Sequence, residues 1–185
     1  MAKKALVPIA DGIEEIEAVC IIDVLRRAGA EVTVASVDGL EITASRGVKL
    51  VADKLIGDSA DETFDLIVLP GGMPGAEHLR DSAILAGMLK DQKQSGRLYA
   101  AICASPAVAF GAHSLLDDKT ATCHPALADQ LKCLQAVDSR VVTDGNCITS
   151  CGPGTAIEFA LELVRLLYGK DTAKAVAGPM LVPGP

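Results

Sequence analysis

The 185-residue sequence contains very few aromatic residues: no Trp, two Tyr and three Phe, together 3% of the chain. Hydrophobic residues make up 50% of the chain, so its core must be built mostly from Val, Ile, Leu and Ala. A core of this kind is typical of a buried parallel sheet covered by helices. A chain of this length buries roughly 70% of its unfolded surface in one domain. We therefore expect residues 1–185 to form a single domain.

The sequence also lacks a basic stripe, and its formal net charge is −7. Because phosphate groups repel an acidic chain, neither nucleic acid nor a membrane surface is expected as its main partner. No apolar segment reaches the roughly 18 residues that a transmembrane helix needs. The first ten residues include two lysines and a short apolar run, but Pro8 interrupts this run and no small-residue cleavage site follows. We expect a strand there, and not a signal peptide.

Cysteines are present, but their spacing matches neither a metal site nor a disulfide framework. They stand at positions 20, 103, 123, 133, 147 and 151, and no pair has C-x2-C spacing. Disulfide frameworks suit small secreted domains, whereas this chain is long enough for an ample core. The phosphate-binding patterns G-x-G-x-x-G and GK[ST] are missing too. We expect reduced thiols, no metal, no cofactor and a cytoplasmic location, or the nucleus or a plastid if a targeting segment has been removed.

Strand-like and helix-like segments alternate along the chain. Short apolar runs predict strands at residues 4–10, 31–37, 42–45, 48–52, 64–69, 98–102, 120–123, 140–144 and 146–150. Helices are predicted at residues 14–28, 82–94, 104–113 and 155–168. The turn at Asp144-Gly145 predicts an antiparallel hairpin between the last two strands. This order is typical of an α/β fold: a mostly parallel sheet with helices on both faces and a crevice at the carboxyl ends of its strands. Residues 173–182 are expected to form a short helix and a tail near that crevice.

Cys103 is the most informative residue in the chain. It follows the strand-like segment 98–102 and precedes a helical segment that has Pro106 in its first turn. A thiol at such a corner faces free backbone N–H groups and the positive end of the helix dipole, which favour the thiolate. This predicts a nucleophile with a lowered pKa. The alternative, a small buried hydrophobic residue, stays open from position alone.

Gly71-Gly72 follows another apolar strand, where backbone without side chains can direct N–H groups into the crevice. The N–H groups of Gly72 and Ala104 together predict an oxyanion hole beside Cys103. A tight turn without function is the alternative for this glycine pair.

Glu17 begins an apolar stripe on the first helix, whereas Glu14 and Glu15 suit a solvated first turn. A carboxyl group that is partly buried beside a thiolate has a raised pKa. Glu17 is therefore a candidate to be protonated, to hydrogen-bond the sulfur and to carry a proton. Ordinary capping of the helix is the alternative interpretation.

His124 precedes Pro125 in a loop at a strand end, which makes a Cys–His pair a reasonable hypothesis. Arg27 and Arg46 are expected to be structural or to hold an anion. Asp23, four residues before Arg27, predicts an ion pair on the helix face.

Taken in order along the chain, these strand ends, loops and helix starts resemble those of the DJ-1 family of the DJ-1/PfpI superfamily. The matching residues run nearly from end to end: 5–7, 12–17, 23–29, 45–48, 68–72, 75–76, 100–104, 124–125, 149–150 and 152–155.

The resemblance implies a flavodoxin-like three-layer sandwich and a homodimer that uses the first helix. It also implies that Cys103 is the reactive cysteine, with Glu17 as its protonated partner and His124 nearby. The family's backbone donors match Gly72 and Ala104. The remaining pocket or anion-binding positions match Gly71, Arg27, Arg46, Ser105 and Pro153.

Three residues depart from the family pattern. Ser105 stands where relatives often have Gly or Ala, and its hydroxyl is expected to narrow the pocket or add a polar group to it. Cys151 replaces a common Arg or Gln. Peptidase-like relatives have His directly after the nucleophile, where this chain has Ala104, so proteolysis is disfavoured.

The resemblance implies a cofactor-independent glyoxalase III or deglycase that acts on glyoxal, methylglyoxal or early glycation adducts of amines. A second hypothesis is a redox-sensing protective protein or chaperone that uses oxidation of the same cysteine. Both hypotheses depend on the same side chains, and the sequence does not separate them.

Overall fold

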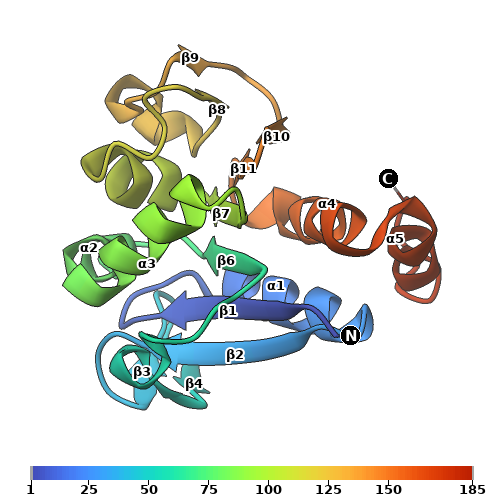
Figure 1. Ribbon diagram of the computed structural model, residues 1–185, viewed down its shortest axis with the longest axis horizontal. Helices are drawn as coiled ribbons and strands as arrows, with labels where there is room; N and C mark the ends of the chain where they lie inside the picture. The colour runs from blue at the N-terminus through green and yellow to red at the C-terminus, as the bar shows by residue number, and fades with distance from the viewer. Residues whose placement is uncertain (1, 185) are drawn as a thin grey trace.

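The computed structural model describes residues 2–184, so Met1 and Pro185, the two ends of the expected domain, lie outside it. Its centre is a seven-stranded sheet in the order β10-β11-β7-β6-β1-β2-β5 (Figure 1). Its strands are β1 (Lys4–Ile9), β2 (Glu31–Ser36), β5 (Lys54–Leu55), β6 (Leu66–Leu69), β7 (Leu98–Ile102), β10 (Val141–Asp144) and β11 (Cys147–Ser150). Every neighbouring pair is parallel except β10 and β11, which form the expected antiparallel hairpin. The predicted mostly parallel α/β sheet is confirmed.

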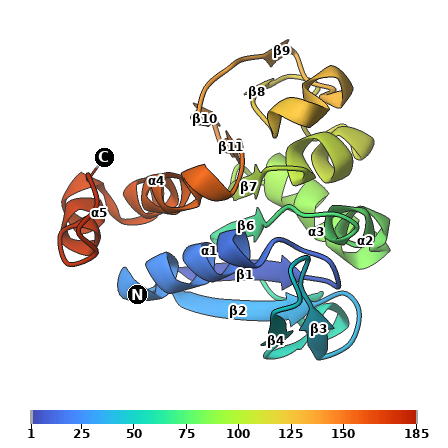
Figure 2. The ribbon, with the colours of Figure 1, turned by 180° about the vertical axis from the view of Figure 1, so that it is seen from behind.

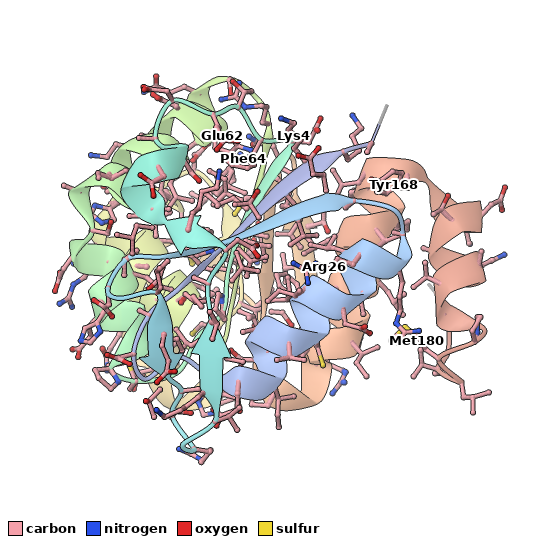
Figure 3. The ribbon with its side chains drawn as sticks, turned by 90° about the horizontal axis from the view of Figure 1, so that it is seen from below. Lys4, Arg26, Glu62, Phe64, Tyr168 and Met180 are labelled. Atoms are coloured by element: carbon pink, nitrogen blue, oxygen red, sulfur yellow. The ribbon has the colours of Figure 1, made fainter. Side chains whose placement is uncertain are left out.

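Helices cover both faces of the sheet and complete the flavodoxin-like sandwich. They are α1 (Glu15–Arg27), α2 (Gly75–Asp81), α3 (Ala83–Gln94), α4 (Ala156–Tyr168) and α5 (Lys170–Ala177). Helix α1 packs against α4, and α4 against α5, whereas α3 contacts β6 and β7. Figure 2 shows α1 crossing β1, and Figure 3 shows the sheet between α1, α4 and α5 on one side and the helices of the other layer. Within residues 2–184, no helix has the length and hydropathy of a membrane span.

The core lies along the central strands, and this explains why they read as continuous apolar runs. All four residues of β6 are buried, and β1 is buried from Ala5 to Ile9. The rings of Tyr99 and Phe110, two of the chain's five aromatic residues, pack with their centroids 5.5 Å apart. A parallel sheet covered on both faces needs apolar residues at successive positions.

Several elements differ from the expectations. The strand predicted at 64–69 begins at Leu66, and the one predicted at 120–123 is β8 (Thr120–Ala121), which pairs with β9 (Gln135–Ala136). The segments predicted at 42–45 and 48–52 are β3 (Glu41–Thr43) and β4 (Lys49–Val51), a separate hairpin. Helix α2 is not predicted from the sequence, because its seven residues follow a five-residue loop, 70–74, and carry little periodicity.

The C-terminal segment does form a short helix, α5, but the expected placement of the tail was wrong. Residues 182–184 line a hollow of about 740 Å³ together with β10 and α4, and neither Cys103, Glu17 nor His124 lines it. In Figure 1 the C-terminus and α5 lie at the right, whereas the carboxyl end of β1 points left.

Candidate active site

Cys103 lies at the corner between β7 and a helical segment whose central turn, Pro106–Phe110, is π-helical. Its φ of 65° is in the left-handed region, which costs a residue other than glycine roughly 1 kcal/mol or more. Two backbone hydrogen bonds hold this conformation: Cys103 N–H donates to Ser150 O (2.9 Å), and Cys103 O accepts from His124 N–H (2.8 Å). A nucleophile on a strained strand-to-helix turn is aimed out of the sheet in this way.

The Gly71-Gly72 loop is in direct contact with this corner. A Cβ on Gly71 would lie 2.6 Å from Cys103 Cβ and 2.8 Å from Ala104 N, closer than real Cβ atoms approach. Gly72 has φ +90°, and a Cβ there would meet the backbone of Glu14. The structure therefore assigns these glycines to close backbone approach. The backbone N–H groups of Gly72 and Ala104 both lower the pKa of the Cys103 thiol.

Glu17 is completely buried, with an exposed fraction of 0%, and lies beside Cys103. Its Oε2 accepts a hydrogen bond from Gly71 N–H at 2.7 Å. Its Oε1 is buried and has no well-aligned hydrogen-bond partner within residues 2–184, although the carboxyl group interacts with the Cys103 thiol. Burial raises the pKa of Glu17 from 4.5 to about 7. The carboxyl group is therefore poised to gain or lose a proton near neutral pH.

The protonation of Cys103 corrects the expectation of an acidic thiol. Burial, followed by the negative charge of Glu17, raises the pKa of Cys103 from 9.0 to about 12. The N–H groups of Gly72 and Ala104 act in the opposite direction, but they do not outweigh burial. Two negative charges in contact repel each other, so the Cys103–Glu17 pair carries one charge at a time and titrates as a unit.

The other glutamates of the first turn of α1 are also buried, contrary to the expectation of a solvated turn. Glu14 and Glu15 are 9% and 7% exposed. Glu14 Oε2 accepts from Glu17 N–H at 2.8 Å and so caps the helix, while Glu15 accepts from Ser45 Oγ (3.0 Å) and Arg46 N–H (2.9 Å). The charge of Glu14 also contributes to the raised pKa of Glu17. Three carboxyl groups thus converge on the start of α1.

His124 reaches the site through its backbone. Besides the bond to Cys103 O, its ring Nδ1 accepts from Ala126 N–H at 3.2 Å, and its Cδ2 faces Gly152. Among the hydrogen bonds of residues 2–184, none joins the His124 ring to Cys103 or Glu17. The structure does not form the expected Cys–His side-chain pair.

The two arginines are not brought to Cys103 within one chain. Arg27 forms the expected ion pair with Asp23 (Nε–Oδ2 2.6 Å) at the far end of α1, beside a small hollow next to α5. Arg46 lies in the loop between β3 and β4, with its Nη1 3.2 Å from Ser45 O, and is exposed.

The remaining expected positions are also placed. Ser105 is fully buried and donates to Pro70 O at 2.5 Å, so its hydroxyl does not enter the pocket as expected. Pro153 is exposed and begins the short helical turn Pro153–Thr155. Cys151 Sγ lies 3.4 Å from Thr122 Oγ1.

Sequence reasoning missed Ser150, which accepts the Cys103 N–H through its carbonyl and whose Oγ lies 2.6 Å from Thr155 Oγ1. Its one sequence signal is its position at the end of a strand beside β7.

All six cysteines are free. Within the described part of the chain, no group of three or more His, Cys, Asp or Glu side chains is arranged to hold a metal ion.

A strained cysteine at a strand-to-helix corner, backed by a buried glutamate on a flavodoxin-like sheet, defines an α/β protein with a cysteine-centred site. Residues 3–166 match the model of the DJ-1/PfpI family. The chain belongs to this family.

Individual relatives agree with this assignment. The chain is 52% identical over 182 residues to Protein DJ-1 homolog B of Arabidopsis thaliana, an alignment that spans 97% of this chain but only 42% of that relative. It is 37% identical over 169 residues to a Caenorhabditis elegans protein named glutathione-independent glyoxalase DJR-1.2, covering 90% and 89% of the two chains. The solved structure of oxidized Toxoplasma gondii DJ-1 superimposes with a TM-score of 0.95 at 53% identity, covering 98% and 99%.

Proposed function

We propose that the chain is a cofactor-independent, cysteine-dependent glyoxalase that converts methylglyoxal to lactate and glyoxal to glycolate. Early glycation adducts of amines are proposed as further substrates, as for a deglycase. The observation that carries the proposal is the contact between Cys103 and the buried carboxyl group of Glu17. The C. elegans relative named as a glutathione-independent glyoxalase supports it.

The first step joins Cys103 Sγ to the aldehyde carbon. The Glu17 carboxylate takes the thiol proton as the S–C bond forms, and the C=O electron pair moves onto oxygen. The N–H groups of Gly72 and Ala104, which also lower the pKa of the thiol, donate to this oxyanion. Glu17 then returns the proton to the oxygen, which gives a hemithioacetal.

The second step is an internal redox reaction. The Glu17 carboxylate removes the proton from the former aldehyde carbon, and the electron pair forms an enediolate with the neighbouring carbonyl. Glu17 delivers the proton to that neighbouring carbon, and the hydroxyl proton of the first carbon moves to the neighbouring oxygen. The neighbouring carbon thus becomes an alcohol while the first carbon becomes a thioester. Water hydrolyses the thioester to the hydroxy acid and frees the thiol. A carboxyl group with a pKa of about 7 suits a group that accepts and returns a proton near neutral pH.

The test is lactate formation from methylglyoxal by the purified wild-type chain, Cys103→Ser, Glu17→Gln and the control Cys151→Ser. We expect turnover by the wild type and by the control, and a loss of about 100-fold or more in the two site variants. Wild-type turnover no greater than that of Cys103→Ser would remove this function.

A second candidate is a redox-sensing protective protein or chaperone, favoured by the oxidized state of the T. gondii relative. Hydrogen peroxide would convert the Cys103 thiol to sulfenic acid and a second peroxide to sulfinic acid, each releasing one water. Protonated Glu17 would then donate a hydrogen bond to the sulfinate. Mass spectrometry of peroxide-treated protein tests this. We expect two added oxygens at Cys103 before the other five thiols react, and the reverse order rejects it.

We further propose that the chain forms a homodimer through α1. Two exposed apolar residues on this helix, Ile16 (53% exposed) and Val19 (47%), are accompanied by Val48 (47%) and Val51 (71%) on and beside the β3–β4 hairpin. Exposed apolar side chains on one helix suit an interface with a second copy. Sedimentation is expected to give a dimer for the wild type and monomer for Val19→Asp, and a monomeric wild type would exclude it.

A further inference from the structure

Ser105 makes a buried connection between the two loops that surround Cys103. The exposed fraction of Ser105 is 0%, and its Oγ donates to Pro70 O at 2.5 Å, across 35 residues of sequence. This hydrogen bond joins the start of the helical segment after Cys103 to the residue that follows β6. A buried hydrogen bond of this kind fixes the separation of the segments that it joins.

The residues next to this bond supply the donors of the site. Pro70 directly precedes Gly71, whose N–H donates to Glu17 Oε2 at 2.7 Å and where a Cβ would lie 2.6 Å from Cys103 Cβ and 2.8 Å from Ala104 N. Gly72 follows Gly71, Ser105 directly follows Ala104, and the N–H groups of Gly72 and Ala104 both lower the pKa of the Cys103 thiol. The Ser105–Pro70 bond is thus one or two residues away from every backbone donor to the Cys103–Glu17 pair.

We propose that Ser105 is a positioning residue, whose hydroxyl holds the two loops so that the N–H groups of Gly72 and Ala104 converge on Cys103 Sγ. Ser105 does not touch the reacting atoms. Hydrogen bonds from N–H to sulfur are long and depend on direction, so a small separation of the loops weakens both together.

The experiment measures the pH profile of Cys103 alkylation by iodoacetamide, followed by mass spectrometry of the Cys103 peptide so that the other five thiols do not interfere. Ser105→Ala is expected to move the profile to higher pH and to slow alkylation at pH 7 by roughly three- to tenfold, because donors to a charged sulfur are weakened. Ser105→Thr retains the hydroxyl and is expected to restore most of the wild-type profile. Ser59→Ala, which removes another fully buried serine hydroxyl, in the turn after the edge strand β5, is the matched control and should leave the profile unchanged.

A Ser105→Ala profile that superimposes on the wild type overturns the proposal. If Ser105→Ala does not fold, the comparison is made between Ser105→Thr and Ser105→Gly, and identical profiles for this pair overturn it equally. Alkylation reports on Cys103 without any aldehyde substrate. The result therefore holds whether or not methylglyoxal is turned over.

Discussion

The two ends of the sheet hold their charges in opposite ways. At the carboxyl end, Glu17 is fully buried, and among residues 2–184 its carboxyl group meets a thiol and a single backbone N–H, with no cation beside it. At the amino end, Lys3 and Asp65 pair at 3.1 Å with side chains that are 42% and 38% exposed. Water and an opposite charge stabilise the second arrangement, whereas the first raises a pKa. The comparison indicates that the raised pKa of Glu17 comes from burial without charge compensation.

The largest expected effect tests how tightly the reactive end is packed. Gly71→Ala places a Cβ 2.6 Å from Cys103 Cβ, so we expect it to cost about 3 kcal/mol or more of stability and to disturb Cys103 alkylation. Gly87→Ala, on the exposed side of α3 with nothing within 4 Å, is expected to stabilise by roughly 0.5–1 kcal/mol. Urea unfolding of both variants measures the difference, and similar values for the pair would contradict this packing.

The next effect is the pH dependence that Glu17 gives to folding. Its pKa rises from 4.5 to about 7 on folding, so the folded chain binds this proton more tightly than the unfolded chain does. Glu17 contributes fully to the free energy of unfolding below pH 4.5, and this contribution is lost as the pH rises through about 7. The loss amounts to about 3 kcal/mol, because each pKa unit corresponds to about 1.36 kcal/mol. We expect Glu17→Gln to remove this decline, measured as the free energy of unfolding between pH 5 and 8. A wild-type curve parallel to that of the variant would show that Glu17 does not titrate in this range.

The smallest effect is expected at the solvated end. Asp23 and Arg27 pair at 2.6 Å, but their side chains are 50% and 48% exposed. Exposed i,i+4 pairs contribute about 0.3–0.5 kcal/mol, so Asp23→Asn should change the free energy of unfolding by no more than this. A thermal melt of the variant measures it. A much larger loss would reveal another partner for one of the two side chains.

Much of the fold follows from local pattern. Apolar runs such as 66–69 predict central strands, Asp144-Gly145 predicts the hairpin, and Gly29, with φ +84°, ends α1 where the sequence places it. Helix α2 lacks such a pattern: no side chain caps its start, and it packs against the helical segment Pro106–Phe110, which is distant in sequence.

The sequence predicts which residues form the site better than it predicts their protonation or their hydrogen bonds. The strand-to-helix corner at Cys103 and the apolar stripe after Glu17 can be found in the sequence. The raised pKa of the thiol cannot, because it depends on how completely the fold buries the sulfur. The direction of the Ser105 hydroxyl likewise depends on Pro70, which is distant in sequence.

The backbone contact between the loops at Gly12 and Gly72 limits how the surroundings of Cys103 can vary. A Cβ on Gly72 would meet backbone atoms of the loop that holds Gly12, and one on Gly12 would lie 2.5 Å from Pro74 Cδ. Where backbone atoms line the contact, no side chain is present whose size or charge a substitution could change. Variation around Cys103 would therefore have to come from other neighbouring segments, such as the loop of His124, whose N–H donates to Cys103 O.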